Sequence, residues 1–222
     1  MIRAVVFDLD GTLFDRDSAV RSLGDAQYLA FQSELTGVSQ EQFVSRLLEL
    51  DGHGLGDKEK VYGRLVLEFG LRAVLTSKLV EDFWGRYHRF CRPFPDAVHT
   101  LKALRARGKG IGLVTNGRRV IQNGTIDALQ IRRLLDAILI SEVEGVRKPD
   151  RAMFERAAAR LGVAPSECCH VGDHPDVDIA GARAAGMKAV WKRVPYWTPP
   201  SEPVPIIDEL SEVLANDCLG GE

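Results

Sequence analysis

The N-terminal segment, residues 2–13, constrains the fold more than any other part of the sequence. Its first half is apolar apart from Arg3 and contains two adjacent valines, which is typical of a strand buried on both faces of a parallel sheet. Asp8 and Asp10 follow, and Gly11 allows the chain to turn away. Because ligands bind beyond the carboxyl ends of strands in open α/β sheets, we expect both carboxylates at a functional site.

Asp8 and Asp10 carry like charges two residues apart. Carboxylates this close favour either a bound cation or unequal protonation. Mg²⁺ prefers oxygen ligands and needs neither cysteine nor histidine, so it suits this pair. The alternative is a strand followed by an ordinary Asp-Gly turn without a ligand, and segments further along the chain are needed to choose between the two.

From Pro93 onward the sequence alternates between short apolar runs and helical patterns. This alternation predicts an α/β fold with a doubly wound parallel sheet and right-handed crossovers. We expect the segment 195–205, which is rich in proline, to be extended at the surface. The expected strands are 110–115, 137–141, 168–171 and 188–191, and the expected helices are about 95–107, 118–130, 150–161, 177–185 and 207–215.

Between the first strand and Pro93 the sequence shows only helical periodicity. Asp17 or Ser18 is expected to cap the first helix, and Ser39 and Gln42 fit a capping box that opens the second. We therefore predict a Rossmann-like core and an all-helical cap inserted after its first strand, with the connectivity of a lid. The core comprises residues 1–14 and 94–222 and the cap residues 15–93; the four helices are expected over about 17–36, 39–50, 58–70 and 77–90, with a glycine-rich break at 51–57.

Composition excludes several function classes. The 222 residues are 45% hydrophobic and carry a net charge of −2, so there is no electrostatic basis for binding nucleic acid or an anionic membrane. No apolar run approaches the roughly 18–20 residues of a membrane span. Met1 leads directly into a strand, so we expect a cytoplasmic protein without a signal peptide. The four cysteines, which we expect to be reduced structural thiols, are Cys91, Cys168, Cys169 and Cys218.

Polar residues also end the later strands. Thr115, Asn116 and Gly117 end one strand in a potential phosphate cradle, although such turns are common without a ligand. Lys148 precedes a proline, which restricts it to an extended geometry that suits a fixed cation or an ordinary solvated lysine. Near the fourth strand, Asp173 and Asp178 are metal-ligand candidates, whereas Asp176 is expected to cap a helix.

Four of these segments together resemble the haloacid dehalogenase-like hydrolase superfamily. They occur in order, cover the whole expected core, and the first is the most specific. The helical insertion after the first segment is similar to the subgroup that includes phosphoglycolate phosphatase-like and pyrimidine nucleotidase-like enzymes. The segments are Asp8-Leu9-Asp10-Gly11-Thr12, Thr115-Asn116-Gly117, Lys148-Pro149, and Gly172-Asp173 with Asp178.

The resemblance implies a Mg²⁺-dependent phosphatase acting on a small phosphorylated metabolite. Asp8 is the expected nucleophile, which forms an aspartyl-phosphate. Asp10 is expected to protonate the leaving alkoxide and then to deprotonate water. The expected metal ligands are Asp8, the Asp10 carbonyl oxygen and Asp173, with Asp178 either a ligand or a partner of bound water or Lys148. The expected substrate contacts in the core are Thr12, Thr115, Asn116, Gly117 and Lys148.

Related activities are weighed by single residues. Dehalogenases of the superfamily carry a non-acidic residue in place of Asp10, because a halide departs without a proton. Phosphonate hydrolases need an imine-forming cap lysine, and we expect none of the cap lysines to be specially buried. A phosphosugar mutase and a non-catalytic phosphometabolite sensor stay open as alternatives. His174 and Val177 depart from the usual residues of the fourth segment. We expect these differences to affect access to the site or the hydrogen bonds around the metal ligands, but not the metal ligands themselves.

The substrate is expected to be selected by the cap. Arg46, His53 and Lys58 cluster around the glycine-rich break and are our candidate contacts, although a plain surface position is the alternative for each. The sequence leaves open a nucleotide, a sugar phosphate or a flavin phosphate as substrate. It also leaves open a monomer or a homodimer.

Overall fold

The computed structural model describes residues 1–215, and the chain divides into two compact units. Unit 1 comprises Met1–Phe14 and the chain from Pro93 onward, and unit 2 comprises Asp15–Arg92. Phe14 and Pro93 pair as an antiparallel bridge, and the Phe94 backbone N–H donates to the Leu13 carbonyl oxygen at 3.0 Å. The chain therefore leaves and re-enters unit 1 at neighbouring points.

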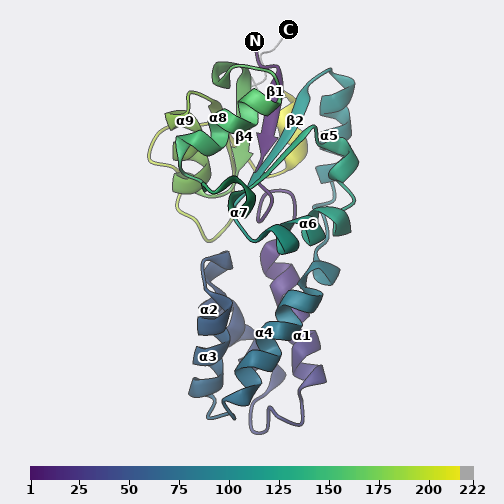
Figure 1. The fold of residues 1–222 in the computed structure, drawn as a ribbon, viewed down its shortest axis with the longest axis vertical. Coiled ribbons are helices and arrows are strands. Elements are labelled where there is room, and N and C mark those ends of the chain that lie inside the picture. The colour runs from purple at the N-terminus through teal and green to yellow at the C-terminus, as the bar shows by residue number, and fades with distance from the viewer. Residues whose placement is uncertain (216–222) are drawn as a thin grey trace. The chain divides into compact units, whose positions relative to one another are not determined.

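Unit 1 is built on a six-stranded parallel sheet in the order β3-β2-β1-β4-β5-β6 (Figure 1). The central strand β1 pairs with both β2 and β4, so that Phe7 lies opposite Leu113 and Val171. This order places the ends of β1 and β4 side by side although they are far apart in the sequence. The strands are β1 (Ala4–Phe7), β2 (Gly110–Thr115), β3 (Ala137–Ile140), β4 (Cys168–Gly172), β5 (Lys188–Lys192) and β6 (Ile206–Ile207).

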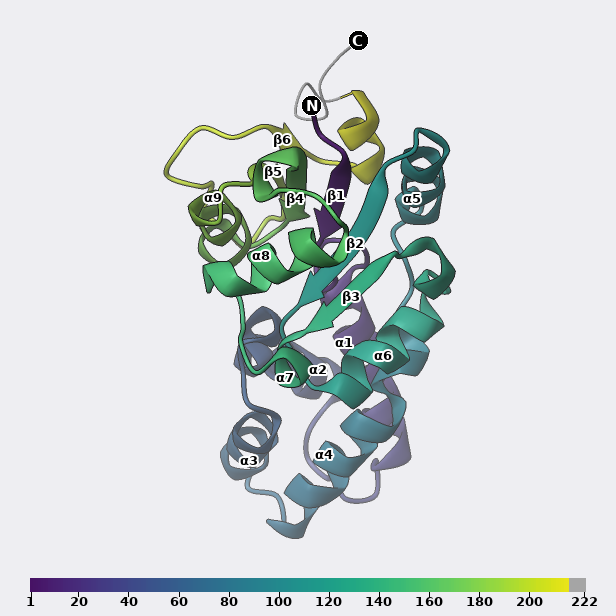
Figure 2. The ribbon, with the colours of Figure 1, turned by 45° about the horizontal axis from the view of Figure 1, so that its top comes forward.

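Both faces of β1 are buried. The helices beside the sheet include α5 (Ala97–Ala106), α8 (Arg151–Arg160) and α9 (Gly181–Ala184). Ala4 packs with Phe154 of α8 and with Ala182 of α9, and Val6 packs with Met153 of α8. Val5 and Phe7 point to the opposite face and are just as buried, so a second layer covers that side. In Figure 2, α8 and α9 lie on one side of the sheet and α5 on the other. The predicted doubly wound α/β core is confirmed.

Helices connect the strands of unit 1. They are α5 (Ala97–Ala106), α6 (Arg119–Ala128), α7 (Ser141–Glu144), α8 (Arg151–Arg160) and α9 (Gly181–Ala184). Four further helical segments, three of them 3₁₀-helical and one π-helical, are Arg132–Leu134, Pro165–Glu167, the π-helical Pro175–Ala180 and Leu210–Ala215.

Two expected helices of unit 1 differ from the structure. The expected helix 177–185 is divided into a π-helical turn, Pro175–Ala180, and the short α9, with His174 as the N-cap in place of the predicted Asp176. The expected helix 207–215 begins only at Leu210, because Ile206 and Ile207 instead extend the sheet beside β5. Two successive β-branched residues favour that extended conformation.

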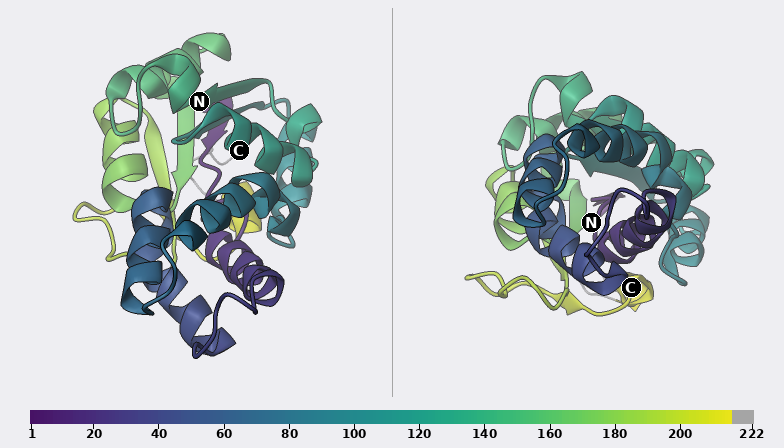
Figure 3. Two further views of the ribbon diagram at one scale, coloured as in Figure 1. Left: turned by 60° about the horizontal axis from the view of Figure 1, so that its bottom comes forward. Right: turned by 90° about the horizontal axis from the view of Figure 1, so that it is seen from below.

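Unit 2 is all-helical, as its periodicity predicts (Figure 3). Asp15 caps the first helix, two residues before Asp17 and three before Ser18, the two predicted caps. The predicted Ser39–Gln42 capping box is present. Its elements are α1 (Arg16–Ala30), α2 (Gln40–Asp51), a short helix Gly52–Gly54, α3 (Lys58–Glu68), α4 (Val74–Arg86) and a short helix Tyr87–Phe90.

A buried polar network joins three helices in the interior of unit 2. The Tyr62 hydroxyl donates to Gln27 Oε1 at 2.7 Å, and Gln27 Nε2 donates to the Leu79 carbonyl oxygen at 2.9 Å. These bonds join α3, α1 and α4, and they satisfy an amide that is fully buried.

No helix within residues 1–215 is long and apolar enough to cross a membrane. Cys91, Cys168 and Cys169 are buried. Cys218 lies outside the described residues.

Candidate active site

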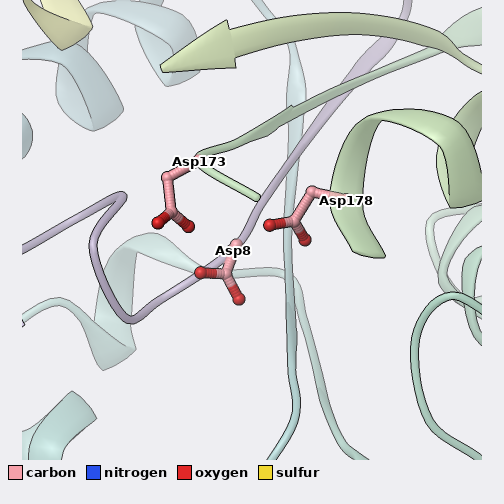
Figure 4. Close-up of side chains that lie close together, drawn as sticks. All are labelled: Asp8, Asp173 and Asp178. Atoms are coloured by element: carbon pink, nitrogen blue, oxygen red, sulfur yellow. The ribbon is translucent and has the colours of Figure 1, made fainter. Parts of the chain in front are cut away.

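Three buried carboxylates meet at the carboxyl ends of β1 and β4 (Figure 4). Asp8 follows β1, and its backbone N–H donates to the Val171 carbonyl oxygen at 2.9 Å, which fixes it beside β4. Asp173 follows β4, and Asp178 comes from the π-helical turn after it. One oxygen of each carboxylate lies within 4.8 Å of the others. The parallel pairing of β1 and β4 thus brings together residues that are distant in the chain.

Gly172 allows this approach. A Cβ at its position would collide with the side chain of Asp178. Glycine is therefore required here because the turn after β4 folds back over the strand end.

Lys148 is the buried cation of the site. Its Nζ lies 2.5 Å from Asp8 Oδ1 and 2.6 Å from Asp178 Oδ1. The loop that carries it is held by Asn116, which accepts from the Lys148 backbone N–H at 2.9 Å and donates to its carbonyl oxygen at 3.0 Å. The Asn116 side chain therefore positions Lys148, in addition to the backbone contact with phosphate that we predict for this residue.

The protonation of the cluster follows from burial and charge. Burial raises the pKa of Asp8 to about 7, although the ammonium of Lys148 opposes the rise. Burial, together with the charges of Asp178 and Asp8, holds the pKa of Asp173 well above its ordinary value. Burial also opposes the ionisation of Asp178, but Lys148 and His170 outweigh it and lower the pKa of Asp178. Lys148 and Asp178 thus form an ion pair, and the other two carboxylates resist ionisation beside it.

These residues fit a divalent cation. Asp8 and Asp173 supply carboxylate oxygens in a buried place where, besides burial, neighbouring carboxylates raise the pKa of each: Asp178 and Asp10 that of Asp8, and Asp178 and Asp8 that of Asp173. A divalent ion would relieve that repulsion. Asp178 differs, because its Oδ1 accepts from Lys148 and its Oδ2 accepts from the His174 backbone N–H at 3.1 Å. Asp178 thereby anchors Lys148, while its part in binding metal stays a prediction.

The remaining predicted core residues surround the carboxylates. Asp10 Oδ2 accepts from Gln122 Nε2 at 2.7 Å, and Thr115 Oγ1 accepts from the same nitrogen at 2.5 Å. The Thr12 hydroxyl lies 3.5 Å from Asp173 Oδ1, and the Gly117 backbone N–H donates to Ser141 Oγ at 3.0 Å. Thr12 therefore faces a carboxylate, and its predicted contact with substrate is untested.

Three residues at the site were not predicted. Gln122, on α6, contacts Asp10 and Thr115. His170, inside β4, has its Nε2 3.2 Å from Asp178 Oδ1, and burial lowers its pKa despite that carboxylate. Trp197 donates from its indole nitrogen to Asp173 Oδ2 at 3.1 Å. The sequence does contain a signal for two of them. His170 is a histidine within an apolar strand, and Gln122 is a glutamine one turn into the helix that follows a polar strand end.

Trp197 adds to our expectation for the segment 195–205. The segment lies largely at the surface, as expected, but the indole ring of the half-buried Trp197 lies against the His174 ring, with centroids 4.4 Å apart, and reaches Asp173. Nothing in a proline-rich run indicates which of its aromatic residues turns inward.

The three cap candidates lie in unit 2, and each is paired with carboxylates there. Arg46 Nε lies 2.6 Å from Glu68 Oε2 at the surface, and His53 Nδ1 lies 2.6 Å from Asp17 Oδ2. Lys58 Nζ lies 2.6 Å from Asp51 Oδ1. Our expectation that no cap lysine is specially buried was wrong, because only 6% of Lys58 is exposed. Their contacts with substrate stay predictions.

Asp51 is the centre of a buried charge cluster in unit 2. Its carboxylate also accepts from Arg16 Nη1 at 2.5 Å and from the Gly54 backbone N–H at 3.0 Å. Burial opposes the ionisation of Asp51, but Arg16 and Lys58 outweigh it and hold its pKa below the ordinary value of 3.8. This cluster joins the start of α1 to the glycine-rich segment between α2 and α3.

Comparison with known proteins gives the family. The family model described as haloacid dehalogenase-like hydrolase matches residues 2–186. Glyceraldehyde 3-phosphate phosphatase from Methanopyrus kandleri is 35% identical over 202 residues, which are 86% of this chain and 83% of that protein. Pyrimidine 5'-nucleotidase YjjG from Escherichia coli is 29% identical over 222 residues, covering 95% of this chain and 96% of its own.

A solved structure of a 2-haloacid dehalogenase from Pseudomonas syringae shares the fold, with a TM-score of 0.64, 30% identity and 97% of each chain covered. The chain belongs to the haloacid dehalogenase-like hydrolase family. The predicted family is confirmed, and the predicted class of enzyme, a phosphatase of this family, is confirmed by the family match and the phosphatase relatives.

Proposed function

We propose that this chain is a Mg²⁺-dependent hydrolase that cleaves small phosphate monoesters through an aspartyl-phosphate on Asp8. The observation that carries the proposal is the buried Asp8 carboxylate, held by Lys148 beside Asp173, with the carboxyl group of Asp10 following in the same turn. An acidic residue at position 10 favours ester hydrolysis over dehalogenation, because an alkoxide needs a proton and a halide does not.

The reaction has two displacement steps. In the first, an oxygen of Asp8 attacks phosphorus, the bond from phosphorus to the ester oxygen breaks, and Asp10 gives its proton to the departing alkoxide. In the second, Asp10 takes a proton from water, the hydroxyl oxygen attacks phosphorus, and the bond to Asp8 breaks to release inorganic phosphate. The proton that Asp10 takes from water replaces the one that it gave to the alkoxide, so Asp10 is protonated again at the end of each turnover.

Other residues of the chain stabilise the transferred group. Lys148 and the hydroxyl of Thr115 hold the phosphoryl oxygens, and the Asn116 backbone N–H donates to them, while Gly117, whose N–H bonds to Ser141, gives the turn its shape beside the phosphate. Asp8, Asp173 and the Asp10 carbonyl oxygen would hold the metal, with Asp178 anchoring Lys148. When bound, Mg²⁺ supplies charge neutralisation to the phosphoryl group.

The substrate is a small phosphorylated metabolite, selected by the cap through Arg46, His53 and Lys58. The two named phosphatase relatives support a sugar phosphate or a pyrimidine nucleotide as the first compounds to try. We propose a cytoplasmic monomer or homodimer. A phosphosugar mutase is the second candidate, since it would use the same pair of carboxylates.

The test is phosphate release from a panel of phosphomonoesters that includes glyceraldehyde 3-phosphate and pyrimidine 5'-nucleotides. Wild type, Asp8→Asn and Asp176→Asn are each assayed with Mg²⁺ and with a chelator. Asp176 is a matched control, because it is an exposed carboxylate on the turn that carries Asp178. Metal-dependent release that only Asp8→Asn abolishes would support the proposal. A folded wild type that releases no phosphate from any ester would contradict it and favour a mutase or a sensor.

A further inference from the structure

Gln122 lies in the interior of the site although it belongs to none of the four sequence segments. Only 3% of it is exposed. Its Nε2 lies 2.7 Å from Asp10 Oδ2 and 2.5 Å from Thr115 Oγ1, and the Asn116 carbonyl oxygen is a more distant acceptor at 3.4 Å. One side chain of α6 thereby connects the proposed acid-base residue to the proposed phosphate cradle.

Gly117 makes room for this side chain. A Cβ at Gly117 would lie 2.9 Å from both Cγ and Cδ of Gln122. The glycine therefore does more than end the strand: without it, the amide could not reach Asp10. The backbone of the turn and the side chain of α6 fit each other closely.

The contact holds the carboxyl group of Asp10 in place. An N–H donated to Oδ2 fixes the orientation of the carboxyl group that must give a proton to the leaving group. The hydroxyl of Thr115 accepts from the same amide, so its own hydrogen is left to donate to a phosphoryl oxygen. Gln122 thus orients two groups that act in successive parts of the reaction.

We propose that Gln122 is a positioning residue for the acid-base function of Asp10. The inference rests on the proposed function, since it concerns the proton that Asp10 transfers. A purely structural glutamine would affect all substrates alike when replaced, whereas a residue that positions a proton donor matters most when the leaving group needs a proton.

The test therefore varies the leaving group. Gln122→Met keeps the length of the side chain and removes both N–H donors. It is assayed with the best alkyl phosphomonoester of the panel and with p-nitrophenyl phosphate, whose aryl oxide departs without a proton. We expect kcat/KM to fall on the order of 100-fold for the alkyl ester and far less for the aryl ester.

The second step gives an independent readout. Asp10 must also deprotonate water to release the phosphate from Asp8. In Gln122→Met, kcat for p-nitrophenyl phosphate is therefore expected to fall, and KM to fall by a similar factor, so that kcat/KM changes little. Loosened packing would not lower kcat while sparing kcat/KM. Asn123→Ala is the matched control on α6, because the half-buried Asn123 bonds to Arg119 and Arg132, away from the site.

A double-mutant comparison completes the test. If Gln122 acts through Asp10, then Asp10→Asn combined with Gln122→Met is no slower on the alkyl ester than Asp10→Asn alone. Equal losses of kcat/KM on both esters would overturn the inference, and so would a loss in the double variant equal to the product of the two single losses. Neither result would contradict the proposed phosphatase function. If wild type hydrolyses neither ester, the proposed function itself has failed. Circular dichroism and the unfolding midpoint verify that each variant is folded.

Discussion

The indole Nε1 of Trp197 donates a hydrogen bond to Oδ2 of Asp173 at 3.1 Å, and Trp191 donates from its own indole nitrogen to the Asp173 backbone oxygen at 2.5 Å. Two tryptophans thus fix both the backbone and the carboxylate of one proposed metal ligand. Groups that orient a ligand in this way contribute to metal affinity although they never touch the metal.

We expect Trp197→Phe to weaken Mg²⁺ binding about 10- to 100-fold, because the carboxylate of Asp173 loses its donor while an aromatic ring remains. Isothermal titration of the protein with Mg²⁺, in the absence of substrate, measures the affinity. Trp84→Phe, in unit 2, controls for the loss of an indole ring. An unchanged affinity in Trp197→Phe would mean that the hydrogen bond does not orient the ligand.

Gly11 offers a way to separate backbone strain from crowding at the metal site. Its φ is +80°, and a Cβ there would lie 2.6 Å from Asp173 Oδ2. Gly108 has a similar φ of +70° but nothing within 4 Å of the same position. Both alanine variants should lose about 1–2 kcal/mol in the free energy of unfolding from the left-handed conformation. Only Gly11→Ala should also weaken Mg²⁺ binding, as measured by titration; equal affinities in the two variants would count against this geometry.

Lys148→Met should lower kcat about 10²- to 10³-fold, because the site loses its fixed cation and Asp8 loses the group that holds it. The measurement is steady-state kinetics at saturating Mg²⁺ on the best phosphomonoester. Lys188→Met, an exposed lysine on β5, is the matched control and should keep full activity. If Lys148→Met retains the wild-type kcat, Lys148 does not take part in catalysis.

The buried Asp51 cluster predicts a pH-dependent stability of unit 2. Asp51→Asn leaves Arg16 and Lys58 buried without their carboxylate, which should lower the free energy of unfolding by about 3–5 kcal/mol at neutral pH. Because the pKa of Asp51 is lower in the folded state than its ordinary value of 3.8, its contribution is fully present above that value and is lost as the pH falls through the folded pKa.

Chemical denaturation of wild type and Asp51→Asn at several pH values between neutral and 3 measures this contribution. The gap between the two proteins should be constant down to about pH 5 and shrink below pH 4. Glu68→Gln removes the carboxylate from an exposed cluster with Arg46 and should change stability little at any pH, since exposed ion pairs are screened by water. A gap that is independent of pH would show that the ionisation of Asp51 is not its source.

The longer strands could be predicted because they are buried on both faces, so their sequences are almost continuously apolar. The segment 110–115 is apolar throughout apart from its last residue and two glycines, and the structure has β2 over the same residues. The two-residue strand β6 could not be predicted, because its pairing depends on an adjacent strand edge and not on its own pattern. Likewise, the cap of the turn after β4 is the ring of His174, whose Nδ1 accepts from the Asp176 backbone N–H, a role that carboxylates usually fill.

At the site, sequence reasoning reached the residues that follow strand ends and missed those that reach in from elsewhere. Asp8, Asp173 and Lys148 could be identified because the carboxyl edge of a parallel sheet collects such residues. Trp197 and Gln122 contact Asp173 and Asp10 only through tertiary packing, which a one-dimensional pattern does not encode. The burial of Lys58 has the same origin, because it depends on how α1 and α2 bring Arg16 and Asp51 together.

The bridge between Phe14 and Pro93 makes unit 1 tolerant of changes in the segment inserted between these two residues. Since the exit and entry points of the core are already paired, a short turn would suffice to connect them, and the strand order would be unchanged if Asp15–Arg92 were removed. The entropy of closing a loop grows slowly with its length, so inserts of very different size cost the core similar free energy here. An insertion at this point can therefore change in length or be replaced while the strand order of unit 1 stays the same.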